Sequence, residues 1–212
     1  MESFACNTSK TTINNRPLRN QGFDMKPTPN VSKTMQDTID HYAACPIEFW
    51  EGTKDHDVSQ NINALLRHMS SPKPTVLDFG CGPGRDLKEL NTRGCESIGL
   101  EGCLEFCEMA RAYSGSKVFH QNFVELNLPQ NTFDGVFANA TLFHVHRSHL
   151  LAVLKTFHQS LKTNGVVFCS NPRGPNIEQV NGLRYGNYME ADGWASFFRK
   201  AGFKLCEEYY RP

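Results

Sequence analysis

Residues 75–86 read Thr-Val-Leu-Asp-Phe-Gly-Cys-Gly-Pro-Gly-Arg-Asp, and this stretch decides the fold. A short apolar and β-branched run at 75–77 is followed by glycines at alternate positions, Gly80, Gly82 and Gly84, and then by residues that favour a helix. This order predicts a strand, a tight turn and a helix. The glycines permit positive φ angles and a close approach of the backbone, and the free N–H groups of the next helix point to the same place. The stretch therefore predicts a seat for a nucleotide-like ligand.

The spacing of these glycines indicates the class of ligand. A dinucleotide fingerprint places its third glycine five residues after the first, whereas Gly84 follows Gly80 by four. Asp78 stands two residues before Gly80, and its carboxylate would repel a pyrophosphate but attract an ammonium or sulfonium group. The spacing disfavours an NAD-dependent oxidoreductase and favours a cationic nucleoside.

Length and charge limit the function further. The 212 residues suit one α/β domain with a real core. Lys plus Arg and Asp plus Glu both number 22, and no basic stripe is present, so nucleic acid is disfavoured as a partner. No apolar run approaches the ~20 residues that span a bilayer, and the polar N-terminus lacks a signal-peptide core. The eight cysteines form no Cys-x-x-Cys pair. We expect a cytoplasmic protein with reduced thiols, no metal and no membrane partner, and the sequence leaves its oligomeric state open.

The organisation of the chain follows from its hydrophobic pattern. Residues 1–35 are dominated by Thr, Asn, Ser, Lys and Pro, and we expect a disordered polar tail there, with one domain over residues 36–212. Residues 171–189 are rich in Gly and Asn and predict a long functional loop. Expected helices cover 35–50 (broken at Pro46), 58–69, 86–93, 104–113, 149–161 and 192–201, and expected strands cover 95–100, 117–121, 133–140, 166–170 and 203–209.

An acidic residue follows the second strand. Glu101 lies 21 residues after Gly80, where a carboxylate accepts hydrogen bonds from both ribose hydroxyls of an adenosine. After the third strand come Asn122 and Phe123, and the amide oxygen of Asn122 can accept from an adenine amino group. The sequence therefore predicts adenosine recognition.

The stretch from Asp78 to Gly84 resembles motif I of the class I S-adenosylmethionine (SAM) dependent methyltransferases. The resemblance implies a Rossmann-like α/β fold, in which a doubly wound, mostly parallel sheet carries helices on both faces. It also implies that SAM is the cofactor. We expect the usual C-terminal antiparallel strand of that fold to be missing, because too few residues follow 203–209 to form it. The residues that we expect to bind SAM are Asp78, Gly80, Cys81, Gly82, Gly84, Glu101, Gly102, Asn122, Phe123 and Asn139.

Several longer stretches are together similar to the methyltransferase family that completes ovothiol biosynthesis and to its bacterial relatives. These stretches are residues 54–61, 77–87, 133–145, 170–174, 184–188 and the Tyr-Tyr-Arg-Pro run at 209–212. The similarity implies methyl transfer from SAM to a small molecule, and in particular to an imidazole nitrogen of a thiohistidine. It is specific for the superfamily and suggestive for the substrate. Those relatives continue for a short stretch past the Tyr-Tyr-Arg-Pro run, and this chain does not.

Four residues are candidates for the chemistry of such a transfer. His144 follows the fourth strand, and either it or Tyr185 could take the imidazole proton. Arg173 or Arg184 could hold the carboxylate of the acceptor. His144 could equally be a packing or capping residue. The alternative to an enzyme is a catalytically impaired module that keeps the methyltransferase fold and binds SAM or a partner protein.

Overall fold

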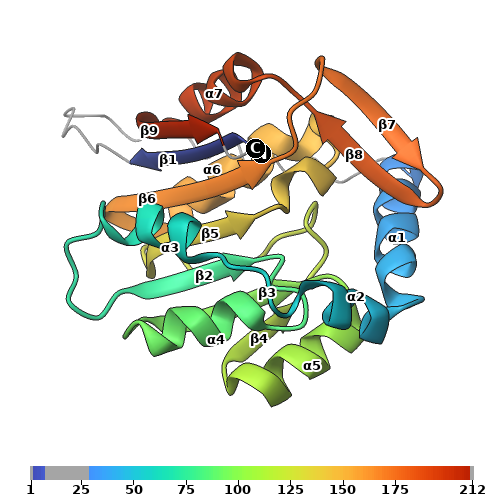
Figure 1. Ribbon diagram of the computed structural model, residues 1–212. Helices are drawn as coiled ribbons and strands as arrows, with labels where there is room; N and C mark the ends of the chain where they lie inside the picture. The colour runs from blue at the N-terminus through green and yellow to red at the C-terminus, as the bar shows by residue number, and fades with distance from the viewer. Residues whose placement is uncertain (1, 8–28, 211–212) are drawn as a thin grey trace.

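Seven strands form the main sheet of the computed structural model, which describes residues 2–7 and 29–210, with side chains over 30–210 (Figure 1). The strands are β1 (Glu2–Asn7), β2 (Thr75–Phe79), β3 (Glu96–Glu101), β4 (Lys117–His120), β5 (Phe133–Asn139), β6 (Leu161–Asn171) and β9 (Lys204–Tyr210). Their order across the sheet is β4-β3-β2-β5-β6-β1-β9. The strands from β4 to β6 pair in parallel, whereas β1 runs antiparallel to both of its neighbours.

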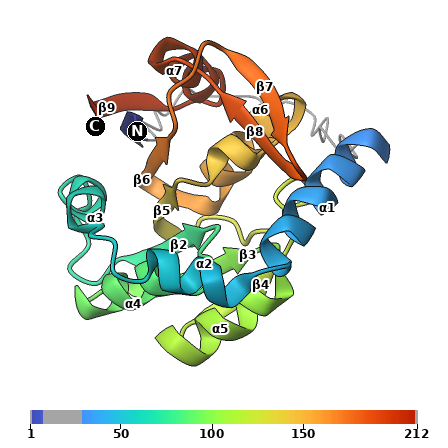
Figure 2. The same ribbon diagram turned by 45° about the vertical axis from the view of Figure 1, so that its right-hand side comes forward.

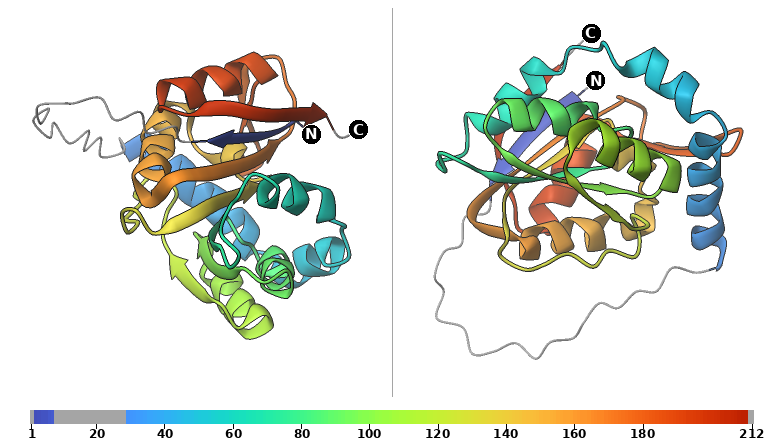
Figure 3. Two further views of the ribbon diagram at one scale, coloured as in Figure 1. Left: turned by 90° about the vertical axis from the view of Figure 1, so that its left-hand side faces the viewer. Right: turned by 90° about the horizontal axis from the view of Figure 1, so that it is seen from below.

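Helices cover both faces of this sheet (Figure 3). They are α1 (Pro29–Ala43), α2 (Pro46–Thr53), α3 (Ser59–Leu66), α4 (Arg85–Thr92), α5 (Leu104–Ser114), the 3-10 turn η1 (Leu142–His144), α6 (Arg147–Ser160) and α7 (Ala191–Lys200). Helices α3, α4 and α5 pack on one face, and α6 and α7 pack on the other. The predicted doubly wound α/β fold is confirmed. The predicted break at Pro46 is also present, since it separates α1 from α2.

The core follows from the apolar strands. β5 is buried along most of its length because both of its faces are covered, which is why its sequence is a continuous apolar run. On one face Phe79 and Phe157 make an edge contact with ring centroids 4.8 Å apart. On the other face Phe137 and Phe168 stack at 5.1 Å, beneath α3. The turn that follows β2 is therefore held between two well-packed layers of side chains, one on each face of the sheet.

In the described residues no strand follows β9, but the place of the usual C-terminal antiparallel strand is filled by another segment. β1, dark blue in Figure 1, lies between β6 and β9 and pairs with both. It pairs from Glu2 with Asn171 to Asn7 with Val166 on one side, and with β9 on the other. The N-terminal segment therefore occupies the place that the usual C-terminal strand of this fold would fill. The sequence does not reveal this, because β1 is about 160 residues away from β6 along the chain and a six-residue strand has little pattern of its own.

The expected disordered tail is corrected by the same observation. Of residues 1–35, the structure describes β1 and the beginning of α1, which starts at Pro29. The polar composition of residues 1–35 predicts disorder because the segment has few apolar residues, yet α1 buries Val31 and Met35 against Tyr185. The remainder, residues 8–28, lies outside the described residues.

The predicted loop at 171–189 is instead a two-stranded hairpin, formed by β7 (Ile177–Asn181) and β8 (Arg184–Tyr188). Asn181 pairs with Arg184 across a two-residue turn that begins at Gly182, with φ of 63°. Glycine at the first central position is the signal of a type II′ hairpin turn, and Gly182 could have revealed this element. Figure 2 shows that the hairpin leans over the sheet and meets α1 at its tip.

Two further properties of the described residues concern membrane-spanning helices and cysteines. None of their helices has the length and apolarity needed to cross a membrane. The seven cysteines whose side chains are described are free thiols, five of them buried.

Candidate cofactor and acceptor site

A cavity of about 750 Å³ lies over the carboxyl ends of β2, β3 and β5, with α1 and α2 covering it. This is the edge at which open α/β sheets bind their ligands. The volume falls within the usual range for small-molecule sites.

The glycine turn after β2 forms the floor of the cavity. Gly80, Gly82 and Gly84 all have positive φ, at 75°, 51° and 98°. A Cβ on Gly80 would lie 2.2 Å from the Thr141 side chain, and one on Gly84 would lie 2.7 Å from the backbone of Ala110. At Gly82 the nearest atom would be 3.7 Å away. Gly80 and Gly84 thus permit close packing, and Gly82 leaves its space open to a ligand.

Glu101 closes the β3 side of this floor. Its Oε2 accepts from the Gly82 N–H at 3.0 Å, and its Oε1 accepts from the N–H groups of Gly102 and Cys103 at 2.7 and 3.0 Å. Burial raises the pKa of this carboxyl, and the three backbone donors act against that rise. A carboxylate oxygen can accept more than one hydrogen bond, so Glu101 can hold ribose hydroxyls while it ties the turn to β3.

Asp78 lies beneath the turn and does not line the cavity. It is 1% exposed, and its Oδ2 has no hydrogen-bond partner. Burial raises its pKa well above the usual range, and the nearby charge of Asp86 raises it further. Asp86, in the first turn of α4, lines the cavity instead, as do Glu101 and Asp57. Asp86 was within the decisive stretch of sequence but was not predicted as a site residue.

Asn122 and Phe123 line the cavity beyond Glu101, next to β4. The amide oxygen of Asn122 accepts from the backbone N–H of Val124 at 3.1 Å, so it already holds a turn together. Phe123 packs on Phe79 with ring centroids 4.5 Å apart. Of the other expected cofactor residues, Cys81, Gly102 and Asn139 also line the cavity.

His144 lines the far end of the cavity in contact with Tyr42 of α1. Its Nδ1 lies 2.7 Å from the carbonyl oxygen of Tyr185, which can only accept, so Nδ1 carries the proton. Its Nε2 must then accept from the Tyr42 hydroxyl at 2.8 Å. Burial lowers the pKa of His144 to about 4, and burial raises the pKa of Tyr42. At neutral pH this is a neutral histidine beside an oriented tyrosine, and no motif in the sequence singles out Tyr42.

The structure places the other three catalytic candidates in different surroundings. Arg184 is half-buried beside Tyr42. Its charge and a hydrogen bond from it oppose the rise that burial causes in the pKa of Tyr42, and its charge also lowers the pKa of His144. The Tyr185 hydroxyl instead donates to Glu178 at 2.6 Å, and burial raises its pKa, so it is not suited to take a proton. Arg173 is exposed and pairs through its backbone with Met189.

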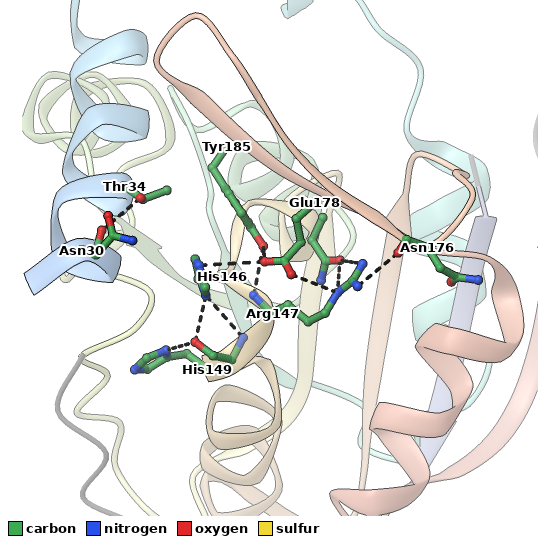
Figure 4. Close-up of polar contacts among 10 residues, drawn as sticks. Asn30, Thr34, His146, Arg147, His149, Asn176, Glu178 and Tyr185 are labelled. Atoms are coloured by element: carbon green, nitrogen blue, oxygen red, sulfur yellow. Dashed lines mark hydrogen bonds and ion pairs between the residues drawn. The ribbon is translucent and has the colours of Figure 1, made fainter. Parts of the chain in front are cut away.

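Figure 4 shows how the hairpin is attached to α6. Arg147, the first residue of α6, donates from Nε and Nη2 to the Asn187 oxygen at 2.9 and 2.8 Å, and from Nη1 to the carbonyl of Asn176 at 3.1 Å. Its backbone N–H donates to the Tyr185 hydroxyl at 3.0 Å. These contacts hold β8 in place, and β8 supplies the carbonyl that orients His144.

The geometry thus defines a Rossmann-like domain with one cavity that has a site for a nucleoside cofactor and contains the Tyr42–His144 pair. Residues 49–208 match the model of the family described as a methyltransferase domain. The chain belongs to this family, and its cofactor is SAM. A comparison with curated proteins gave no match.

Solved structures with the same fold agree with this family. A SAM-dependent methyltransferase from Leishmania major is 19% identical, with a TM-score of 0.67, and the match covers 84% of this chain and 74% of that one. The 1,6-didemethyltoxoflavin-N1-methyltransferase of Burkholderia thailandensis, solved with 1,6-didemethyltoxoflavin and S-adenosylhomocysteine, is 19% identical, with a TM-score of 0.65 and coverage of 88% and 81%. A chain of the complex between the Haloferax volcanii Trm112 methyltransferase activator and its methyltransferase is 22% identical, with a TM-score of 0.65 and coverage of 80% and 77%.

The residues present fit SAM. Gly82 provides an open cradle, Glu101 can hold the ribose, and the Asp86 carboxylate is suited to a cationic ligand. Among the described residues, no group of three or more His, Cys, Asp and Glu side chains is arranged to hold a metal ion.

Proposed function

We propose that this protein transfers a methyl group from SAM to a small molecule, and that the acceptor is an imidazole nitrogen of a thiohistidine. The observation that carries the proposal is the neutral Tyr42–His144 pair in the lining of the cavity. The similarity of residues 133–145, 170–174 and 184–188 to the ovothiol family supports this choice of acceptor. The Burkholderia neighbour, whose name describes an N-methyltransferase of a small heterocycle, agrees with it.

Bound SAM supplies an electrophilic methyl group, and the protein has to orient the acceptor toward it. A neutral imidazole has one N–H donor and one nitrogen lone pair. The Tyr42 hydroxyl donates to His144, so the lone pair of its oxygen that Arg184 does not use remains for an N–H of the acceptor. An acceptor held in this way offers its other nitrogen to the methyl group, and the methylated ring leaves as an imidazolium that gives its N–H proton to solvent. Such positioning is worth about 7–11 kcal/mol in favourable cases.

Arg184 is the residue that we assign to the carboxylate of the acceptor. It is half-buried and adjoins both Tyr42 and His144. A guanidinium can hold a carboxylate with two parallel hydrogen bonds. The proposed acceptor carries both groups that this arrangement recognises, a ring N–H and a carboxylate.

The test is a panel of imidazole, thiol and amine acceptors incubated with methyl-labelled SAM, followed by identification of the methylated atom. We expect 5-thiohistidine to be methylated on a ring nitrogen, and Arg184→Ala to raise the KM for it at least about tenfold. Arg173→Ala is the matched control, because Arg173 is exposed whereas Arg184 is half-buried beside Tyr42, and we expect it to behave as the native protein.

Each other outcome of the panel assigns a different function. Methylation of a thiol or amine and not of the imidazole would replace the acceptor but keep the enzyme. Binding of SAM and S-adenosylhomocysteine with no transfer to any acceptor would support the non-catalytic module. An unchanged KM in Arg184→Ala would remove the carboxylate role of that residue.

A further inference from the structure

Tyr209 on β9 belongs to the Tyr-Tyr-Arg-Pro run, which the proposed function leaves without a role. Its half-buried ring packs against the cluster formed by α3 and the sheet. Its hydroxyl donates to the amide oxygen of Asn61 in α3 at 2.8 Å. Asn61 is 4% exposed and lines the cofactor cavity. Tyr209 therefore reaches the site through a second residue although β9 lies at the edge of the sheet.

From Asn61 the hydrogen bonds continue to Asp86 in one direction. The Asn61 Nδ2 donates to the oxygen of Asn139 at 2.9 Å, and Ser170 Oγ donates to the same oxygen at 2.7 Å. The Asn139 Nδ2 then donates to Asp86 Oδ2 at 3.0 Å. Arg85 Nε holds the other carboxylate oxygen at 2.7 Å.

The Asp86 carboxylate, which accepts and does not donate, determines how both amides are turned. The NH₂ group of Asn139 therefore faces Asp86, and the oxygen of Asn139 accepts from Asn61 Nδ2 and from Ser170 Oγ. The oxygen of Asn61 then accepts from the Tyr209 hydroxyl, which holds Asn61 in this orientation. If either amide were reversed, two donors or two acceptors would face each other inside the protein, which is costly. The chain of contacts therefore has a single favourable orientation.

The end of this chain lies on one particular side of the cofactor cavity. β3 and β5 flank β2 on opposite sides. Glu101 and Asn122 lie on the β3 side and suit the adenosine, whereas Asn61, Asp86 and Asn139 lie on the β5 side. The β5 side therefore faces the other half of SAM, the amino-acid portion, whose ammonium group fits the Asp86 carboxylate.

We propose that Tyr209 is a positioning residue for the amino-acid end of the cofactor, acting through Asn61 and Asn139 on the Asp86 carboxylate. The inference rests on the SAM cofactor of the proposed function and is independent of the acceptor. It gives the Tyr-Tyr-Arg-Pro run a task in cofactor binding. It also makes the affinity for SAM depend on the docking of the β9 edge strand.

The test compares two ligands that differ in the amino-acid portion. S-adenosylhomocysteine carries it, and 5′-methylthioadenosine lacks it. Calorimetry with Tyr209→Phe should show affinity for S-adenosylhomocysteine lowered about three- to tenfold, as for one lost neutral hydrogen bond, and affinity for 5′-methylthioadenosine within about twofold of native. Tyr210→Phe is the matched control, since the neighbouring Tyr210 is 60% exposed, and it should bind both ligands as the native protein does.

A second variant gives an independent test. Asn61→Ala removes the next link and should lower affinity for S-adenosylhomocysteine at least about tenfold. Adding Tyr209→Phe to Asn61→Ala should cause no further loss, because both changes break one chain of contacts. Equal losses for the two ligands in Tyr209→Phe, no loss for either, or additive losses in the double variant would each overturn this inference alone. Failure of the native protein to bind either ligand would overturn the SAM cofactor as well.

Discussion

His144 links the stability of the protein to pH. In the folded protein burial lowers its pKa to about 4, from 6.5 for the free side chain. As the pH falls, the unfolded chain takes up the proton before the folded protein does. The stability that His144 contributes is therefore complete above about pH 6.5 and is lost as the pH falls toward about 4. The difference corresponds to about 3 kcal/mol.

Urea denaturation at pH 7.5 and pH 4 measures this effect. We expect His144→Gln to lose less stability than the native protein over this interval, by up to about 3 kcal/mol. His56→Gln, at an exposed position, should lose as much as the native protein. An equal loss in native protein and His144→Gln would mean that His144 titrates alike in both states.

Gly84 is required by packing in addition to its backbone angle. Gly84→Ala would place a Cβ 2.7 Å from the backbone of Ala110, at a φ of 98°. Gly94→Ala is the matched control, because Gly94 has a similar φ of 86° and no neighbour within 4 Å of an added Cβ. Both should lose about 1–2 kcal/mol for the left-handed angle, and Gly84→Ala a further ~1–3 kcal/mol for the contact. Equal unfolding free energies for the two variants would show that α4 and α5 separate easily.

At the scale of elements, the β7–β8 hairpin depends on Arg147. Arg147→Ala removes three side-chain hydrogen bonds to the hairpin and leaves the buried oxygen of Asn187 without those donors. We expect hydrogen exchange over residues 177–188 to speed up at least about tenfold, since the loss exceeds one ordinary hydrogen bond. The control is Arg199→Ala, at an exposed position on α7. Unchanged exchange would show that the remaining contacts of the hairpin, with α1 and His144, hold it without the Arg147 side chain.

At the scale of the whole molecule, β1 completes the sheet. Deleting residues 1–7 would leave the facing edges of β6 and β9 without their partner. We expect the unfolding free energy to fall by at least about 3 kcal/mol, which lowers the Tm by about 6 °C or more. Chemical and thermal denaturation would measure this loss.

Relocation of the strand provides the control for that deletion. β1 runs antiparallel to β9, so the same residues joined after 210 through a short turn could return to the same place as a hairpin. We expect this variant to regain most of the lost stability. A deleted protein as stable as the native one would mean that β9 docks on β6 without β1.

The sequence allowed the parallel part of the sheet and the glycine turn to be predicted because their signals are local. The spacing of Gly80, Gly82 and Gly84 and the position of Glu101 are each visible within about 25 residues. The identity of Tyr42 and Asp86 as cavity residues was not predictable in the same way. The side chain of each is oriented by a hydrogen bond with a residue more than 50 positions away in the sequence.

Sequence alone thus determined the class of fold, the cofactor and the edge of the sheet that binds it, since strand, turn and helix signals depend on neighbouring residues. Only the tertiary structure decided that β1 fills the sheet, that Tyr42 pairs with His144, and that Tyr209 reaches Asp86 through two amides. These are contacts between segments distant in the chain. Such contacts depend on the direction, packing and burial of the side chains, and no local periodicity in the sequence predicts these properties.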